Sequence, residues 1–528
     1  MAFNLKGLTV AEMLAQRVMP RLDGGRLGEE EYFKEALKLV GAGVGGFILF
    51  GGEFWEVRGY LAKLQAKAKI PLLVASDMER GAGQQLKGAT VYPCQMAVAA
   101  ATDVVSRDGI GLVTEMLDDV ASEARWAGVH AVLGPVLDVN SNPENPIICT
   151  RAFSDEPQKV TALGEQYVAG LQESRIPVMA CAKHYPGHGE ATLDSHTVLP
   201  VVDKDRDSLE EEDMLPFRRA VMKGVEMVMT AHIKVPELDP DYPASLSVRI
   251  TRNYLRNRAG FQGLVLTDAL DMGALTGHYT PMEAARLAIK AGADILLHPP
   301  DPLSYLAGLK ELAARKDVTK DDVMASAGRL QRAKEKYCHP VKATESAIHA
   351  RMNDGAATAD AIAQRALTLV KAGGAFPALA DVKGGVAHIV LEGDGDMMAG
   401  RVLRSVLSAR HKRLTNLFVT KADADKLRDE AVKRAKKATL VIISVFSKVR
   451  AGKGISGLSP ELLELGRQII KANPRTVAVS FGSPYVLRQF MDAEYVVAAY
   501  DPSEAMQQAA CRAFMGEIVF MGNLPVRI

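Results

Sequence analysis

The chain has 528 residues, of which 48% are hydrophobic, so it is long enough to bury more than one core. Its 64 Lys and Arg residues balance 63 Asp and Glu residues, and the resulting net charge of +1 argues against nucleic acid as the main partner. Its five cysteines are scattered without a Cys-x-x-Cys pair, which argues against a disulfide framework and a cysteine zinc site.

The first residues lack a basic stretch followed by an apolar stretch, which is the pattern of a secretory signal. No run reaches the roughly 18 uninterrupted apolar residues that a membrane-spanning helix needs. We therefore expect a cytoplasmic protein without a membrane partner.

Short apolar runs alternate with helical patterns through the first two thirds of the chain. Strands are expected at 44–50, 72–76, 131–139, 178–182, 227–231, 264–267 and 294–298. Helices are expected between them, among others at 114–126, 160–173, 209–223 and 281–291. This alternation indicates parallel strands with crossover helices. Seven runs, with an eighth too weak to recognise, predict an α/β fold of the (β/α)8 TIM-type barrel class.

The pattern breaks near residues 338–340, and a second alternating region follows. Strands are expected there at 386–391, 417–419, 440–445, 477–481 and 495–499, with helices at 397–408, 422–435 and 460–472. We predict a catalytic barrel over residues 1–345 and a smaller C-terminal α/β sandwich domain, with a mostly parallel sheet, over residues 346–528.

Polar residues directly follow the predicted strands of the first domain. They are Asp77, Asp138, Lys183, His184, His232, Asp268 and His298. Barrel enzymes carry their chemistry at the carboxyl ends of the strands, and a barrel brings those ends to one mouth. We therefore expect these side chains to share a site.

The most informative window is residues 183–197, Lys-His-Tyr-Pro-Gly-His-Gly-Glu-Ala-Thr-Leu-Asp-Ser-His-Thr. Its glycines and proline predict a polar loop after a strand. Asp194 precedes His196 by two residues, so in a bent loop the carboxylate can bond the imidazole, fix its tautomer and raise its basicity. We predict that this pair transfers protons, and Glu190 is a competing acid–base candidate.

Asp268 ends a buried strand and is open at the predicted mouth, which suits a nucleophile that forms and releases a covalent intermediate. A nucleophilic carboxylate facing an acid–base group indicates glycoside hydrolysis with retention, here with His196 in place of the second carboxylate. A free imidazole has a pKa near about 6.5 and can both donate and accept a proton near neutral pH. The candidates for holding sugar hydroxyls are Asp77, Arg151, Lys183 and His184.

A metal site is the other use of this loop, with His184, His188, His196 and Asp194 as ligands. Their spacing matches no helical His-Glu-x-x-His pattern, and the glycines between them weaken a rigid site. We predict neither a metal nor a cofactor.

The pattern of these residues resembles glycoside hydrolase family 3, in its β-N-acetylglucosaminidase branch. The matching segments are 183–189 with 194–196, 134–139, 150–154, 229–232 and 266–270, in the family's order, and more loosely 361–370, 480–485 and 523–526. The resemblance implies that Asp268 is the nucleophile and that His196, oriented by Asp194, is the acid–base. It also implies that the terminal N-acetylglucosamine is held by Asp77, Arg151, Lys183 and His184, without a cofactor.

The chain departs from this branch in two places. Asp77 is followed by Met-Glu-Arg-Gly-Ala-Gly where Gln-Glu-Gly-Gly-Arg is expected, which makes Arg80 a candidate substitute, and Ala269 replaces a frequent second Asp. The expected activity is that of a retaining exo-β-N-acetylglucosaminidase acting on small saccharides. A phosphorylase, a β-glucosidase of the same family and an inactive saccharide-binding scaffold are the alternatives. The aglycone stays open among a muropeptide, a chitin fragment and a glycan.

Overall fold

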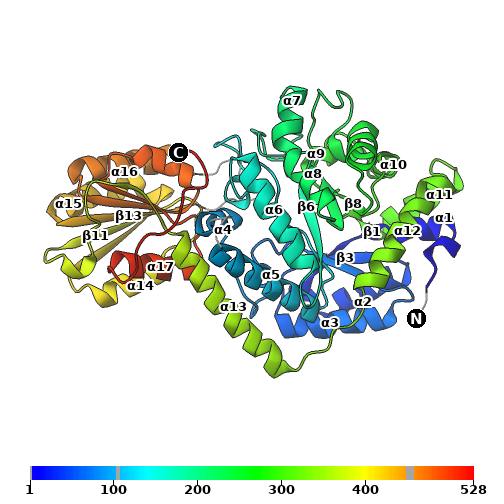
Figure 1. Ribbon diagram of the computed structural model, residues 1–528, viewed down its shortest axis with the longest axis horizontal. Coiled ribbons are helices and arrows are strands. Elements are labelled where there is room, and N and C mark those ends of the chain that lie inside the picture. Colours follow the sequence, from blue (N-terminus) through cyan, green and yellow to red (C-terminus); the bar gives the residue numbers. More distant parts are fainter. Residues whose placement is uncertain (1–2, 103–106, 448–456) are drawn as a thin grey trace. The chain divides into compact units, whose positions relative to one another are not determined.

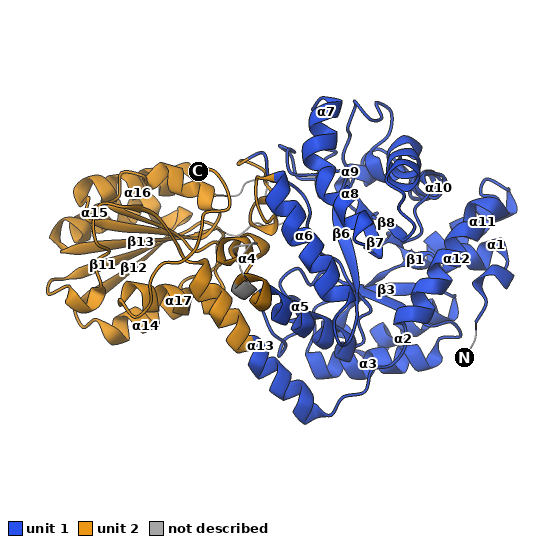
Figure 2. Ribbon diagram, viewed as in Figure 1, with its two compact units in different colours: residues 1–91, 113–142, 157–355 blue, residues 92–112, 143–156, 356–528 orange. Residues whose placement is uncertain are grey.

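The computed structural model describes residues 3–102, 107–447 and 457–528, which form two compact units (Figure 2). Unit 1 comprises residues 1–91, 113–142 and 157–355, and unit 2 comprises residues 92–112, 143–156 and 356–528. The units are thus interleaved along the chain, whereas the predicted domains, 1–345 and 346–528, are continuous. That division remains a prediction.

Unit 1 is built on a parallel sheet of seven strands that follow one another in sequence order (Figure 1). They are β2 (Arg21–Asp23), β3 (Gly46–Phe50), β4 (Leu73–Ser76), β5 (Ala131–Val132), β6 (Met179–Tyr185), β7 (Met227–Thr230) and β8 (Leu264–Thr267). Every residue of β4, β6, β7 and β8 is buried, as in parallel strands covered on both faces.

The helices of unit 1 alternate with these strands along the chain. They include α1 (Val10–Ala15), α2 (Glu30–Gly41), α3 (Phe54–Lys67), α6 (Pro157–Gln172), α7 (Arg206–Ser208), α8 (Leu215–Met222), α9 (Gly273–Thr276), α10 (Pro281–Ala291), α11 (Pro302–Ala314) and α12 (Lys320–Tyr337). The residues of α5 (Arg107–Ala127) run from unit 2 into unit 1. The predicted helix at 209–223 begins instead with a π-helical stretch, Leu209–Asp213, before α8.

Two further short strands, β1 (Val18–Met19) and β9 (Leu296–Leu297), form a parallel pair beside this sheet. The Gly45 amide donates to the Val18 carbonyl at 3.1 Å, and the Thr267 amide donates to the Ile295 carbonyl at 3.1 Å. These bonds connect the pair to the β3 and β8 sides of a curled sheet. The expectation of an α/β fold with parallel strands is confirmed.

Unit 2 contains a six-stranded sheet in the order β10-β15-β14-β13-β11-β12. The strands are β10 (Thr368–Ala372), β11 (Val386–Glu392), β12 (Leu414–Thr420), β13 (Leu440–Ser447), β14 (Thr476–Gly482) and β15 (Tyr495–Ala498). All neighbours pair in parallel except β10, which is antiparallel to β15.

Helices cover both faces of the sheet of unit 2. Figure 1 shows α14 (Arg401–Arg410) and α17 (Glu504–Phe514) on one face, and α15 (Ala424–Lys437) and α16 (Pro460–Ala472) on the other. Two more helices are α4 (Gln95–Ala101), in unit 2, and α13 (Glu345–Ala366), whose residues run from unit 1 into unit 2. The second sheet therefore has the layers of an α/β sandwich.

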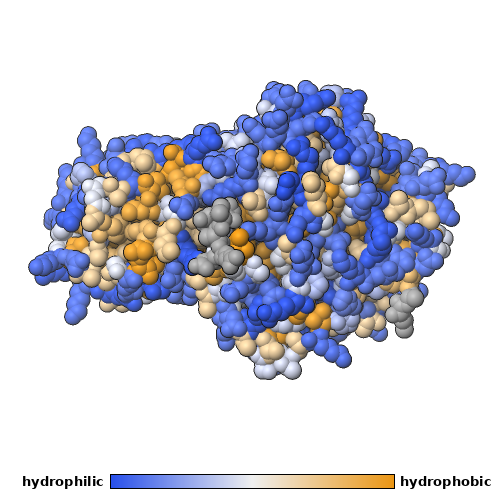
Figure 3. All heavy atoms as spheres, viewed as in Figure 1, coloured by the Kyte–Doolittle hydropathy of each residue, from blue (hydrophilic) through white to orange (hydrophobic). Residues whose placement is uncertain are grey.

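The surface drawn in Figure 3 is mostly hydrophilic, with hydrophobic side chains in scattered patches. Among the exposed large apolar residues, Leu193, Val198 and Val201 flank the loop that carries Asp194 and His196. Within the described ranges, every helix falls short of the length and apolarity needed to cross a bilayer. The cytoplasmic location expected from the sequence remains a prediction.

Candidate active site

Unit 1 carries most of the predicted site residues at the carboxyl ends of its parallel strands. Asp77 directly follows β4, Lys183 and His184 lie near the end of β6, and Asp268 directly follows β8. The strands are paired in register, so these ends lie along one edge of the sheet. Buried strands of this kind hold polar side chains rigidly at their ends.

Lys183 is held between two carboxylates. Its ammonium Nζ lies 2.7 Å from Asp77 Oδ1 and 2.6 Å from Glu79 Oε1, and its side chain is only 2% exposed. A buried ammonium requires such partners because an unpaired charge is costly to remove from water. Glu79 was not among the predicted residues, although its position two residues after Asp77 was an available signal.

Asp138 anchors the start of the loop. Its Oδ2 lies 2.7 Å from His184 Nδ1, and its Oδ1 accepts from the backbone amides of His184 at 3.2 Å and His188 at 2.7 Å. Burial alone would raise the pKa of Asp138, but the charges and hydrogen bonds of the two histidines bring it below its usual value. An ionised Asp138 therefore fixes the orientation of the His184 ring, with Nδ1 directed to the carboxylate.

The structure brings Asp194 and His196 into contact. His196 Nδ1 lies 2.7 Å from Asp194 Oδ1, which also accepts from the His196 amide at 2.9 Å. The Asp194 side chain is 1% exposed and the His196 side chain 39% exposed. The buried carboxylate thus orients the ring, while the ring remains accessible to a ligand.

Asp268 is partly buried and well anchored. Its amide donates to the Thr230 carbonyl at 3.0 Å, and its Oδ1 accepts from the Ala269 amide at 2.8 Å. Burial would raise the pKa of the Asp268 carboxyl, but the electrostatic influence of the nearby His184 and His232 rings lowers it below the usual value. The Ala269 amide and His196 act in the same direction. The ionised carboxylate, the form that can attack a substrate, is therefore favoured.

Backbone contacts tie the Asp194–His196 loop to the segment after Asp268. The Gly273 amide donates to the His196 carbonyl at 3.0 Å, and the Ala274 amide donates to the Ser195 carbonyl at 3.3 Å. A Cβ on Gly273 would lie 2.6 Å from the Thr197 carbonyl oxygen and 2.9 Å from that of His196. Only glycine permits this approach.

The middle of the loop is packed against the segment that follows β5. A Cβ on Gly189 would lie 1.7 Å from the Val139 carbonyl oxygen. The Ser141 hydroxyl donates to Glu190 Oε2 at 2.5 Å. His188 Nε2 lies 3.0 Å from Ser195 Oγ, and burial lowers the pKa of His188 to about 4. Glu190 thus contacts the segment after β5, and His188 contacts Ser195 within the loop.

His232 supports the segment that carries Asp268. Its Nδ1 lies 2.7 Å from Ser245 Oγ and its Nε2 lies 2.9 Å from the Ala269 carbonyl oxygen. Burial is the main cause that lowers the pKa of His232, so the neutral ring donates from Nε2 to the carbonyl. His298 Nδ1 lies 3.2 Å from Asp271 Oδ1.

Arg151 belongs to unit 2, at the end of a short 3-10 helix, Cys149–Arg151. Its Nη1 donates to the Ile147 carbonyl at 3.2 Å. Its predicted contact with the sugar therefore remains a prediction.

Within the described part of the chain, no three His, Cys, Asp or Glu side chains are arranged to hold a metal ion. Two of the four ligands proposed for a metal, His184 and His196, direct Nδ1 to carboxylates at 2.7 Å. The ligand set that the metal alternative requires is thus not assembled there.

Comparisons with known proteins identify the family of the chain. The chain is a glycoside hydrolase. It belongs to glycosyl hydrolase family 3, because the model of the family's N-terminal domain matches residues 10–333. Beta-hexosaminidase A of Pseudoalteromonas piscicida is 29% identical over 421 residues, 75% of this chain and 69% of that protein. Beta-hexosaminidase of Chromobacterium violaceum is 35% identical over 299 residues, 55% of this chain and 82% of that protein.

Solved structures cover almost the whole chain. A glycoside hydrolase family 3 beta-N-acetylglucosaminidase from Paenibacillus sp. str. FPU-7 has a TM-score of 0.84 at 27% identity, over 99% of both chains. The beta-glucoside phosphorylase BglX has a TM-score of 0.86 at 23% identity, over 99% of this chain and 95% of that chain. The second likeness concerns the fold alone.

Proposed function

We propose that the chain is a retaining exo-β-N-acetylglucosaminidase, a β-N-acetylhexosaminidase that removes terminal non-reducing N-acetylglucosamine. The observation that carries this proposal is the buried Asp194 behind an accessible His196, in a loop bonded to the segment after Asp268. The names of the two bacterial β-hexosaminidases and of the Paenibacillus enzyme support the choice of sugar.

In the first step, an oxygen of Asp268 attacks the anomeric carbon while the bond from that carbon to the leaving oxygen breaks. His196 Nε2–H donates its proton to the leaving oxygen, and Asp194 stabilises the charged ring. In the second step, His196 removes a proton from water, the water oxygen attacks the anomeric carbon, and Asp268 is released. Two inversions give net retention.

The same proposal includes the sugar contacts and the closed barrel. Asp77, Lys183 and His184 would hold the hydroxyl and acetamido groups of the terminal sugar. The bonds from β1 and β9 to both sides of the seven-stranded sheet support closure into a (β/α)8 barrel.

Hydrolysis of an aryl β-N-acetylglucosaminide and of the matching aryl β-glucoside tests the sugar assignment. We expect a strong preference for the glucosaminide, whereas a preference for the glucoside would contradict it. Asp268→Ala should abolish turnover of either substrate. Asp271→Ala is the matched control, since it removes a half-exposed carboxylate three residues away. Unchanged activity of Asp268→Ala would reject the nucleophile.

Phosphorolysis is the second candidate, because a neutral histidine repels an anionic phosphate less than a carboxylate acid–base would. The exposed ring of His196 is the feature that favours it. Products formed with and without phosphate separate the two reactions. Free N-acetylglucosamine in both conditions supports hydrolysis, and a sugar 1-phosphate as the main product with phosphate would overturn it.

A further inference from the structure

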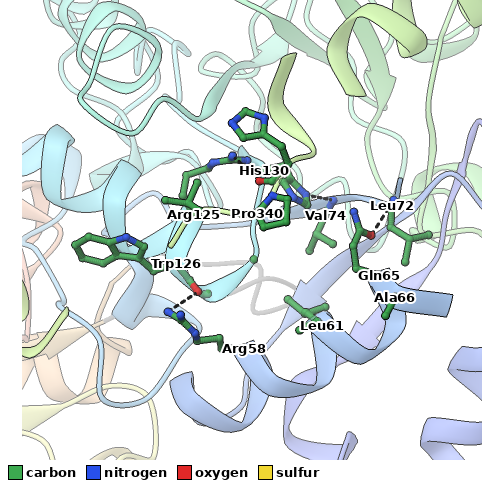
Figure 4. Close-up of a pocket in the computed structure, with 15 residues that line it drawn as sticks. Arg58, Leu61, Gln65, Ala66, Leu72, Val74, Arg125, Trp126, His130 and Pro340 are labelled. Atoms are coloured by element: carbon green, nitrogen blue, oxygen red, sulfur yellow. Dashed lines mark hydrogen bonds between the residues drawn. The ribbon is translucent and has the colours of Figure 1, made fainter. Parts of the chain in front are cut away.

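A cavity of about 400 Å³ lies in unit 1 at the end of the strands opposite the active site (Figure 4). Its wall includes Leu72 and Val74 at the amino end of β4, while Asp77 follows the carboxyl end of the same strand. At about 3.3 Å per residue, Val74 and Asp77 are about 10 Å apart along the strand. The volume is in the range of small-molecule sites.

The walls come from α3, the end of α5, the start of β4 and the segment after α12. Apolar side chains dominate them, among others Leu61, Leu72, Val74, Trp126, Pro340 and Val341. The lining contains two arginines, Arg58 and Arg125, and no Asp or Glu. An apolar wall with cations and no carboxylate is complementary to an amphiphilic anion.

Arg125 is a buried cation without a carboxylate partner in the described residues. It is 5% exposed, and its guanidinium donates to the carbonyls of Tyr337 and, at 3.0 Å, His339. These carbonyls belong to the last residue of α12 and to the second residue after it, and they carry only partial negative charge. The Arg125 Nε–H is buried and has no hydrogen-bond partner within residues 3–102, 107–447 and 457–528. The cation is therefore only partly compensated.

Lys334 is a second buried cation, and it adds to the positive charge of this region. The Lys334 ammonium is 1% exposed and donates to Gln16 Oε1 at 2.7 Å, with no described carboxylate in contact. Burial lowers the pKa of Lys334 to about 8. Lys334 and Arg125 also contribute, after burial, to lowering the pKa of His130 to about 3.

His130 offers a fixed hydrogen-bond donor beside these charges. It lines the cavity and is 7% exposed, and the Val74 amide donates to its Nδ1 at 3.0 Å (Figure 4). The proton of the neutral ring is therefore on Nε2, which has no acceptor among the described residues. The Trp126 indole N–H is also buried, and no acceptor for it lies in the described part of the chain.

Gln65 adds a further donor. Its Oε1 accepts from the Leu72 amide at 2.9 Å, which leaves the NH₂ group to donate (Figure 4). At the rim, Arg58 Nη1 donates to the Trp126 carbonyl at 3.2 Å, and no described carboxylate pairs with Arg58. These side chains can donate hydrogen bonds to a ligand that carries hydrogen-bond acceptors.

We propose that this cavity is a second ligand site, which binds a small monocarboxylate with an apolar body. The carboxylate lies near Arg125 and accepts from His130 Nε2–H and the Gln65 amide. The apolar body packs against Leu61, Val74 and Pro340. The site is independent of the proposed glycosidase activity, because its residues lie at the other end of the strands.

Tryptophan fluorescence of the full chain gives a direct test, because the chain has two tryptophans, Trp55 and Trp126. The Trp55→Phe variant leaves Trp126, in the cavity wall, as the single reporter. Octanoate is titrated as the probe, with octan-1-ol as the neutral match. We expect saturable octanoate binding, at least about tenfold tighter than that of octanol, because only the carboxylate makes charge-assisted hydrogen bonds.

Two substitutions in the Trp55→Phe background locate the site. Ala66→Phe fills the cavity and should abolish the octanoate signal, whereas Lys67→Phe, on the neighbouring exposed residue outside the lining, should retain it. Circular dichroism and glycoside hydrolysis should be unchanged in both. Absent or non-saturable binding, equal affinity for octanol, or equal loss in both variants would overturn the proposal. None of these results bears on the glycosidase assignment.

Discussion

Asp194 gives His196 its proposed role, because a loop histidine without a carboxylate behind it has no preferred orientation. The Asp194→Asn variant keeps the size of the side chain and removes its charge. We expect kcat for an aryl β-N-acetylglucosaminide to fall by about 10²- to 10⁴-fold, the usual worth of a positioned acid–base group. The melting temperature is the control, and full activity in a folded variant would exclude the pair from proton transfer.

The pKa of Asp268 predicts the acid side of the pH profile. Because that pKa is below the usual value, the carboxylate stays ionised as the pH falls, and the acid limb of kcat/KM should lie at or below about pH 4. His184 is the largest of the influences that lower it. In His184→Asn the limb should therefore move to higher pH, whereas His298→Asn should leave it in place. An acid limb of kcat/KM that stays at the same pH in His184→Asn would contradict the influence of His184 on the pKa of Asp268.

The sequence predicted individual polar residues better than their partners. Asp194 and His196 are two positions apart, so their contact follows from local geometry. Glu79 approaches Lys183 only because β4 and β6 bring distant parts of the chain together. Asp138 was recognised as a strand end, but its role as acceptor for two backbone amides depends on the bend after β6.

At the level of secondary structure, the contact between the loop of residues 194–197 and the start of α9 depends on Gly273. Gly273→Ala would place a Cβ 2.6 Å from the Thr197 carbonyl oxygen and displace the loop. We expect at least about a tenfold loss of kcat, since catalytic groups tolerate little displacement. Steady-state kinetics beside a thermal melt separate this effect from unfolding.

Gly59→Ala in α3 is the matched control, because a Cβ there meets nothing within 4 Å. It should raise the free energy of unfolding by about 0.5–1 kcal/mol and leave kcat unchanged. Equal kcat values for the two alanine variants would show that the loop does not depend on this contact.

Strand positions were predictable where apolar runs are uninterrupted. The strand predicted at 264–267 coincides with β8, and the helix predicted at 281–291 coincides with α10. Of the strand predicted at 131–139, the structure contains only β5, because Pro135 has no backbone N–H to donate to a neighbouring strand. β1 and β2 were missed, since Pro20 divides an already short run. Their pairing depends on distant strands, which periodicity does not reveal.

At the scale of the whole molecule, a buried ion network holds unit 1 together. Asp294 accepts from Arg256 Nη2 at 2.5 Å, from Arg329 Nη2 at 2.8 Å and from the Val265 amide at 2.8 Å. Burial would raise the pKa of Asp294, but the two arginines lower it below the usual value. The stability it contributes is thus present above the unfolded-state pKa and is lost as the pH falls through the folded-state pKa.

Asp294→Asn should lower the free energy of unfolding of unit 1 by roughly 3–5 kcal/mol, because two partly buried guanidinium groups, 12% and 17% exposed, lose their buried counter-ion. Urea unfolding near neutral pH measures this change. Asp321→Asn, in the exposed first turn of α12, should stay within about 0.5 kcal/mol of the parent. Equal effects of the two substitutions would exclude the network as a major stabilising element.

The division of the chain into units was harder to predict than either sheet. Residues 92–112 and 143–156 belong to unit 2 through contacts with its C-terminal part. The Cys94 amide donates to Asp501 Oδ2 at 3.2 Å, and the Asn523 amide donates to the Ala100 carbonyl at 3.0 Å. Such long-range bonds have no local signal in the sequence, whereas the strands of the two sheets do.

The glycine contact between Gly273 and the loop of residues 194–197 has a consequence for protein engineering. A loop transplanted from a relative has its own backbone conformation, and its carbonyl groups must leave room for the residue at position 273. The loop and the start of α9 therefore form a single exchangeable module, although more than 70 residues of sequence separate them. Chimeras that exchange both segments together should preserve the spacing between His196 and Asp268, whereas chimeras that exchange the loop alone should disturb it.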